Sequence, residues 1–162
     1  GYYSFLSKKE QENYLGLDLD VDAVNFANSY FKSKVFLNTS LEEFESKKKF
    51  DIVYAFEVLE HLDNPMLGIE KITNLLKKGG LFIGTSPYPY KKNVLPCKTH
   101  NFVLHPENWK RLFLNNGFKN VEIFPMSFPP YLWRINKNLN IKLPFYIPSK
   151  YFVSTSLIVA IK

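Results

Sequence analysis

The stretch that decides the fold reads FDIVYAFEVLEHLDNP over residues 50–65, and LLKKGGLFIGTSP follows over residues 75–87. The first segment begins as an apolar run and becomes charged at Glu57. A stretch with helical spacing follows and is expected to stop at Gly79-Gly80, before a second apolar run. This order is typical of one βαβ unit, in which ligands bind beyond the carboxyl ends of the strands. We therefore expect a site among the polar residues there: Glu57, Glu60, His61, Thr85 and Ser86.

The segments before this unit also alternate between strand and helix. Residues 21–31 have apolar positions at helical spacing, and Asp20 or Asp22 would cap that helix. Short apolar runs on either side predict strands over 14–19 and 35–37. Alternation of this kind favours an α/β domain with a mostly parallel sheet.

The C-terminal part predicts a different ending. A helix is expected to begin at His105-Pro106 and to stop at Asn116-Gly117, where glycine suits a C-terminal cap. The strands that follow have no obvious long helix between them, so we expect an antiparallel hairpin over 121–124 and 156–161. Residues 125–154 are dense in proline and aromatics, and they are interpreted as an insertion at its tip.

Composition bounds the class of protein. At 162 residues, with 46% hydrophobic and 17% aromatic residues, one folded domain over 1–162 is the simplest expectation. The single cysteine, Cys97, excludes an intramolecular disulfide and a cysteine-cluster metal site. No apolar run approaches membrane-spanning length, and the chain begins without a basic-then-apolar signal; a cytoplasmic location is expected. The net charge is +6, and every acidic residue lies at or before Glu122. The basic, aromatic tail leaves contact with an anionic partner open, although scattered lysines alone would also give a basic surface.

Four segments, in this order, resemble the class I S-adenosylmethionine-dependent methyltransferases: YLGLDLD (14–20), EVLEHLDNP (57–65), KKGGLFI (77–83) and NGFKNVEI (116–123). Among these, ubiquinone-pathway O-methyltransferases and the methyltransferase type 11–12–23 group are the most similar. The resemblance implies a Rossmann-like methyltransferase sheet with an antiparallel C-terminal hairpin. It also implies that the family's first strand and glycine-rich loop are absent here, with Gly1 where the last glycine of that loop would be.

The same resemblance implies which residues bind the cofactor. Asp18 would accept the ribose hydroxyls, whereas the alternative role of a helix cap suits Asp20 or Asp22 better. Ser40 stands where the family often has an aspartate next to the adenine, and an ordinary serine turn explains it equally well. The implied S-adenosylmethionine-binding residues are Gly1, Asp18, Leu19, Ser40, Leu41, Phe56 and Glu57.

The charged segment after residue 56 suggests the chemistry. Glu57, Glu60 and His61 have i, i+3 and i+4 spacing, so a helical turn would place them on one face for a metal or for acid–base work. Similar Glu-x-x-Glu-His segments bind divalent metal in two methyltransferase groups, and one of these adds a histidine resembling His100. The implied metal ligands are Glu57, Glu60, His61 and His100. The alternatives are a loop shaped by Glu60-His61 without metal, or His61 or His100 as the base. His105, beside Pro106, is interpreted as a helix cap.

We therefore expect methyl transfer from S-adenosylmethionine to a small-molecule acceptor, with oxygen favoured. Tyr88, Tyr90, the loop over 91–100 and the aromatic insertion would define that acceptor, or would only pack over the sheet. The aromatic residues of the insertion are Tyr131, Trp133, Phe145 and Tyr146. The alternative function is a truncated, non-catalytic methyltransferase-like domain that acts as a binding module. A nicotinamide-dependent enzyme shares the acidic strand end but leaves the Glu-x-x-Glu-His segment unexplained. Nucleic acid is a less favoured partner, and self-association and peripheral membrane contact are left open.

Overall fold

The computed structural model describes residues 14–90, 99–129, 141–149 and 151–162. Its contacts divide the chain into two compact units, residues 1–45 and 46–162, each of which is described by itself. No helix among the described residues has the length and apolar character needed to cross a membrane.

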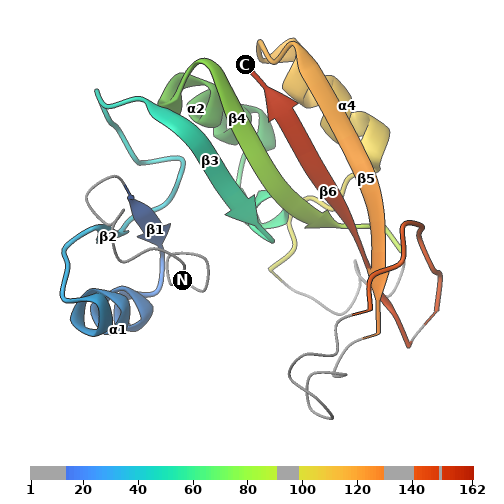
Figure 1. Cartoon of the computed structure of the whole chain (residues 1–162), viewed down its shortest axis with the longest axis horizontal. Coiled ribbons are helices and arrows are strands. Elements are labelled where there is room, and N and C mark those ends of the chain that lie inside the picture. The colour runs from blue at the N-terminus through green and yellow to red at the C-terminus, as the bar shows by residue number, and fades with distance from the viewer. Residues whose placement is uncertain (1–13, 91–98, 130–140, 150) are drawn as a thin grey trace. The chain divides into compact units, whose positions relative to one another are not determined.

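The first unit is a small parallel βαβ arrangement (Figure 1). Strand β1 (Gly16–Asp18) pairs in parallel with β2 (Phe36–Asn38), and α1 (Val21–Phe31) connects them. The Asp20 side chain accepts hydrogen bonds from two backbone amides of the first helical turn, which confirms both the predicted helix and its cap.

The second unit is a four-stranded mixed sheet with strand order β3-β4-β6-β5 (Figure 1). Strands β3 and β4 are parallel, as the predicted βαβ unit requires, whereas β6 is antiparallel to both β4 and β5. The expected C-terminal hairpin is thereby confirmed. Its elements are β3 (Phe50–Phe56), the 3-10 turn η3 (Leu59–His61), α2 (Pro65–Leu75), β4 (Leu76–Pro87), α4 (Pro106–Asn115), β5 (Asn120–Phe128) and β6 (Val153–Ile161).

Helices α2 and α4 cover one face of this sheet, and the core lies between these helices and the sheet (Figure 1). The ring centroid of Phe82 on β4 is 4.8 Å from that of Phe113 on α4. Both side chains and that of Trp109 are fully buried. Burial of each such side chain contributes about 1.5–3 kcal/mol, so this layer holds α4 against the sheet.

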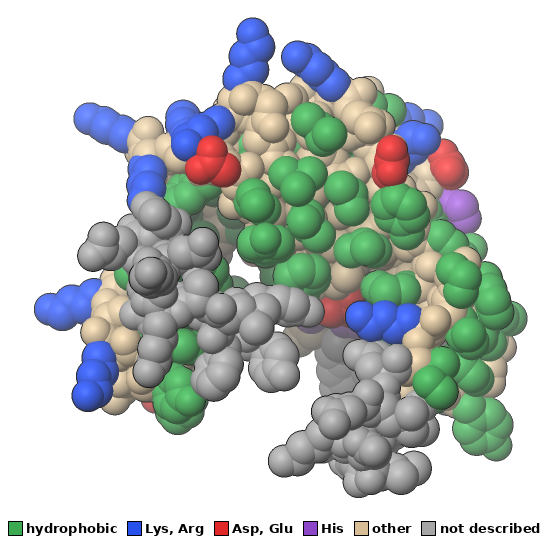
Figure 2. Space-filling model, in the orientation of Figure 1, with side chains coloured by type: hydrophobic (Ala, Val, Ile, Leu, Met, Phe, Trp, Pro, Cys, Tyr) green, Lys and Arg blue, Asp and Glu red, His purple; other side chains and the backbone are tan. Residues whose placement is uncertain are grey.

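The opposite face of the sheet presents apolar side chains in register. Ile52 and Tyr54 on β3 pair with Leu81 and Ile83 on β4, and all four alternate away from the helix layer. Figure 2 shows hydrophobic side chains gathered over this face. Ile52 and Tyr54 remain 42% and 51% exposed. The near-continuous apolar run of β3 is typical of strands that are covered on both faces.

Helix α2 ends earlier than predicted. It stops at Leu75, and Leu76 already pairs with Phe50 as the first residue of β4, so the expected stop at Gly79-Gly80 was wrong. The Lys162 ammonium donates to the carbonyls of Thr73 and Leu76, which closes the helix from the far end of the chain. Gly79 (φ 78°) instead forms an irregularity within the strand.

Strands β5 and β6 extend into the region that we interpreted as an insertion. They run to Phe128 and from Val153, so only the residues between them lie outside the hairpin ladder. Ser127 also forms an isolated bridge with Leu143, which ties the described part of that connection back to β5.

The chain of 162 residues is expected to self-associate. Among the described residues, β3 pairs on one side only, with β4, and an unpaired apolar edge is a template for another strand. Light scattering coupled to size exclusion should therefore give a mass above that of the 19.0 kDa monomer. A monodisperse monomer over a range of concentrations would contradict this prediction.

Candidate active site

The first unit presents Asp18 and Leu19 where β1 ends. Asp18 is exposed, and one carboxylate oxygen accepts from the Asp20 amide at 2.9 Å. Within the described residues, no donor reaches its other oxygen, Oδ2. Leu19, the next residue, is 74% exposed. An acid with an accessible oxygen next to an exposed apolar side chain suits a nucleoside.

The end of β2 lies beside that of β1, because the two strands are parallel. Ser40 Oγ accepts a hydrogen bond from the Glu43 backbone amide at 3.0 Å. This is the serine turn that we gave as one of two interpretations of Ser40. Its hydroxyl hydrogen remains available as a donor, and Leu41 is half-buried next to it. Asn38 was not anticipated: its amide donates to the Asp18 and Leu19 carbonyls and holds the two strand ends together.

In the second unit, Glu57 follows β3 in a left-handed conformation (φ 52°). Its amide donates to both the carbonyl oxygen and Oγ1 of Thr85, at 3.2 and 3.1 Å. Its carboxylate Oε1 lies 3.1 Å from Thr155 Oγ1. Phe56, one residue earlier, is half-buried and stacks on Tyr54 with ring centroids 5.9 Å apart.

Three of the predicted site residues come together after Glu57. Ligand atoms of Glu60, His61 and His100 all lie within 4.8 Å of one another. The rings of His61 and His100 meet edge to face with centroids 4.9 Å apart. Glu60 is fully buried, His100 is half-buried and His61 is exposed, so the cluster opens to solvent on the His61 side.

The backbone determines which nitrogen of His61 is available. His61 Nδ1 lies 2.8 Å from the Thr99 carbonyl oxygen. A carbonyl only accepts hydrogen bonds, so this contact assigns the hydrogen to Nδ1 in the neutral ring. Nε2 then carries the lone pair, which can accept a proton or bind a metal.

A loop from residues 99–102 is fastened to this cluster. The Asn101 amide donates to the carbonyls of His61 and Leu62 and to the Asp63 carboxylate, at 3.2–3.4 Å. The Phe102 amide donates to the Glu60 carbonyl at 3.0 Å. Asn101 therefore holds His100 beside His61. In the sequence, the position of Asn101 next to His100 was the only indication of this role.

Glu57, Glu60 and His61 do not lie on one face of a helical turn, as their spacing predicted. Only Leu59–His61 forms a single 3-10 turn, and the left-handed Glu57 lies before it. The set of ligand atoms within 4.8 Å does not include Glu57. Its carboxylate points to Thr155 on β6 instead, because the reversal in φ turns the chain before the turn begins. Three of the four expected metal ligands are thus brought together.

These three residues fit a divalent metal by donor type and orientation. Two imidazoles and one carboxylate suit manganese, iron or zinc better than magnesium. The Nδ1 hydrogen bond of His61 to a carbonyl is the second-shell contact that metal-binding histidines usually make. Three ligand atoms at about 2.0–2.3 Å from one ion lie closer together than the 4.8 Å limit that these atoms meet here, so they would approach one another on binding.

Aromatic side chains follow β4. Tyr88 lies against Tyr146, with ring centroids 3.9 Å apart, and against Tyr90 at 4.6 Å. Burial raises the pKa of Tyr146, although its hydroxyl bonds with Ser156 at 2.9 Å, and burial also raises the pKa of Tyr90. His105 caps α4 as predicted: its Nδ1 accepts from the second helical amide.

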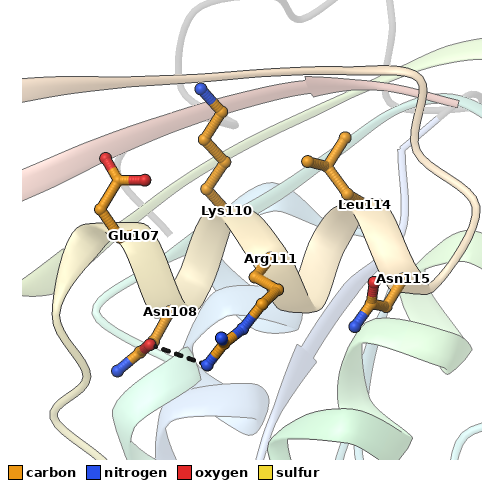
Figure 3. A pocket seen from close by; sticks show the side chains of 6 residues that line it. All are labelled: Glu107, Asn108, Lys110, Arg111, Leu114 and Asn115. Atoms are coloured by element: carbon orange, nitrogen blue, oxygen red, sulfur yellow. Dashed lines mark hydrogen bonds between the residues drawn. The ribbon is translucent and has the colours of Figure 1, made fainter.

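A shallow groove of about 320 Å³ lies on the outer surface of α4 (Figure 3). It shares no residue with the cluster of Glu60, His61 and His100, and Arg111 donates a hydrogen bond to Asn108 within its lining. Its lining consists of Glu107, Asn108, Lys110, Arg111, Leu114 and Asn115. Because one helix supplies the whole lining, the groove cannot enclose a ligand.

Parallel strands with acids at their carboxyl ends, followed by an antiparallel hairpin, define a Rossmann-like protein of the methyltransferase type. A family model described as a methyltransferase domain matches residues 1–82. The chain belongs to this family.

Curated relatives point the same way. A ubiquinone biosynthesis O-methyltransferase of Glaesserella parasuis is 32% identical over 153 residues, which is 77% of this chain and 64% of that protein. The mitochondrial protein of the same description from Dictyostelium discoideum is 25% identical over 130 residues, or 68% of this chain and 40% of that protein. The chain thus spans less than two thirds of the length of each.

Solved structures support the fold. A SAM-dependent methyltransferase from Archaeoglobus fulgidus superposes with a TM-score of 0.68 at 20% identity, covering 91% of this chain and 75% of that one. The N-methyltransferase NodS from Bradyrhizobium japonicum, in complex with S-adenosyl-L-homocysteine, gives 0.60 at 16% identity, covering 90% and 64%. Both likenesses are to methyltransferase structures, and at these identities they show the fold alone.

Proposed function

We propose that the protein transfers a methyl group from S-adenosylmethionine to a hydroxyl oxygen of a small molecule. The observation that carries this proposal is the orientation of His61, whose Nδ1 is bound by the Thr99 carbonyl and whose side chain lies in one cluster with Glu60 and His100 after β3. A hydroxyl acceptor must lose a proton during transfer, and an oriented neutral imidazole is the group that accepts it near neutral pH.

The cofactor would lie at the carboxyl ends of the strands. Asp18 would bind the ribose hydroxyls, and Leu19 would pack against the nucleoside. Ser40 and Leu41 would contact the adenine. Phe56 and Glu57 would lie below the methionine part. Gly1, which we expect at the same site, lies outside the described residues.

The chain's own residues have modest chemical tasks. Bound S-adenosylmethionine supplies an electrophilic methyl carbon, which passes to the acceptor oxygen and leaves S-adenosylhomocysteine. His61 Nε2 accepts the hydroxyl proton, and the Thr99 carbonyl stabilises the resulting imidazolium through Nδ1. Alignment of the reacting atoms does the rest.

A divalent metal would be held by Glu60, His61 and His100, and Glu57 is the fourth ligand that the resemblance implies. It would then supply Lewis-acid stabilisation of the acceptor oxygen. In that case His61 serves as a ligand and not as the base. The two roles exclude each other because both use Nε2.

The acceptor class follows from the aromatic side chains and from the relatives. Tyr88, Tyr90 and Tyr146 form a wall that suits a flat ring. The relatives named for ubiquinone biosynthesis suggest a hydroxylated intermediate of that pathway.

The test is transfer of labelled methyl from S-adenosylmethionine by the intact protein. Acceptors should include a hydroxylated ubiquinone precursor, the same compound with its hydroxyl already methylated, and its amino analogue. We expect label only with the free hydroxyl. Labelling of the amine alone would overturn O-methylation, and binding of the cofactor without transfer to any acceptor would favour the binding-module alternative.

A further inference from the structure

Thr155, on the last strand, contacts the candidate site from 98 residues away. Its Oγ1 lies 2.8 Å from the Ser86 carbonyl oxygen and 3.1 Å from Glu57 Oε1. The side chain is only 4% exposed, so water does not compete for its hydroxyl. Hydrogen bonds shielded in this way are stronger than those at a surface.

Glu57 has a left-handed backbone conformation, which is unfavourable for glutamate. A left-handed residue other than glycine costs roughly 1–2 kcal/mol, and such strain persists only where the surroundings enforce it. Thr85 provides the backbone part, with two acceptors for the Glu57 amide. Thr155 provides the side-chain part, and its one hydroxyl hydrogen is shared between the Ser86 carbonyl and Glu57 Oε1. Backbone and carboxylate are thus held from two different strands, β4 and β6.

The contact with Thr155 leaves the two carboxylate oxygens unequal. Oε1 is turned toward β6, while no donor of a described residue reaches Oε2. Glu57 as a whole is exposed, so Oε2 is available to a ligand. A carboxylate oxygen with fixed direction selects a cation, because it only accepts hydrogen bonds or coordinates positive ions.

We propose that Thr155 is a positioning residue: it fixes the Glu57 carboxylate so that Oε2 meets a cationic ligand. This inference rests on the proposed function. The cation is either the ammonium group of the cofactor or a divalent metal, since both present positive charge to a carboxylate. The sequence around Thr155 does not predict this role, because the role depends on β6 lying antiparallel beside β4.

The experiment uses the intact protein and three variants. Thr155→Val keeps the shape and removes the hydroxyl, whereas Thr155→Ser keeps the hydroxyl and removes the methyl group. Thr73→Val is the matched control, because Thr73 Oγ1 lies within bonding distance of two backbone carbonyls, whereas Thr155 Oγ1 contacts one carbonyl and a carboxylate. Calorimetry with S-adenosylhomocysteine in chelator, and with Mn²⁺ alone, separates the two sources of positive charge.

We expect Thr155→Val to weaken binding of one of these two ligands about tenfold, which is the usual effect of losing one hydrogen bond to a charged group. Thr155→Ser should restore affinity to within about twofold on the same reasoning, and Thr73→Val should leave both affinities unchanged. Unaltered binding of both ligands by Thr155→Val would overturn the proposal. So would Thr155→Ser binding as weakly as Thr155→Val, since the methyl group and not the hydroxyl would then matter.

A ligand-free measurement separates this proposal from the proposed function. Unfolding of wild type, Thr155→Val, Glu57→Ala and the double variant forms a double-mutant cycle. The two substitutions should be non-additive, because each removes the same contact. Additive effects would overturn the positioning role. If wild type binds neither ligand, the proposed function fails while this cycle still decides whether Thr155 holds Glu57.

Discussion

Replacing His61 by alanine is expected to lower kcat by a factor of about 100 or more, because a positioned general base contributes 10²–10⁴-fold. The imidazole is oriented by the Thr99 carbonyl and lies against His100. Affinity for S-adenosylhomocysteine should change little, since His61 acts on the acceptor's proton. Steady-state rates with saturating cofactor, together with calorimetry, test both parts.

His105→Ala is the matched control for this prediction. His105 caps α4 through Nδ1, so its loss should lower thermal stability, by about 0.5–2 kcal/mol, without a comparable loss of rate. If the two histidine variants lose the same activity, the effect is one of folding and His61 has no special role.

Chelator distinguishes the metal from the acid–base role of His61. If Glu60, His61 and His100 hold an ion, EDTA should abolish activity and Mn²⁺ should restore it. His100→Ala should then raise the concentration of Mn²⁺ required. Full activity in EDTA would rule out a role for a metal in the reaction. The base role of His61 would then remain, and His100→Ala would have only a small effect.

Asp18→Ala is expected to weaken binding of S-adenosylhomocysteine by about 2 kcal/mol, which is roughly 30-fold. Asp18 stands at the end of β1 with one carboxylate oxygen bonded to the Asp20 amide. The substitution removes the acceptor for the ribose hydroxyls. Calorimetry on the intact protein gives the affinity directly.

Asp22→Ala controls for the loss of one negative charge in the same unit. Asp22 lies in the first turn of α1 and has no expected ligand, so its variant should bind as wild type does. Equal affinity for wild type and Asp18→Ala would contradict the assignment of Asp18. Asp18→Asn should retain part of the affinity, since an amide still offers one acceptor oxygen.

Local patterns predicted most of the elements. Helix α1 and its Asp20 cap follow from short-range rules, because the cap bonds lie within three residues. The same is true of α4 with its His105 cap. The end of α2 was mispredicted because its last carbonyls are satisfied by Lys162, 86 residues beyond Leu76, and no local rule contains that residue.

The site was predicted in composition but not in geometry. His61 and His100 were named from their residue types and from the resemblance, and they do lie together. The expected helical face for Glu57 was wrong, because spacing along a helix assumes right-handed backbone at every position, and Glu57 is left-handed. Asn101 and Thr155 went unnoticed since polar residues of these types are common and their partners are distant in sequence.

The sequence by itself determined the class of fold, the order of the strands along the chain and the acids at their ends, because hydrophobic periodicity and capping act over a few residues. Only the tertiary structure decided which way each functional side chain faces. His61 is oriented by a carbonyl 38 residues away, and Glu57 by a hydroxyl 98 residues away. Such hydrogen bonds form only after the strands have packed, since their partners are brought together by the burial of the sheet and not by the local chain.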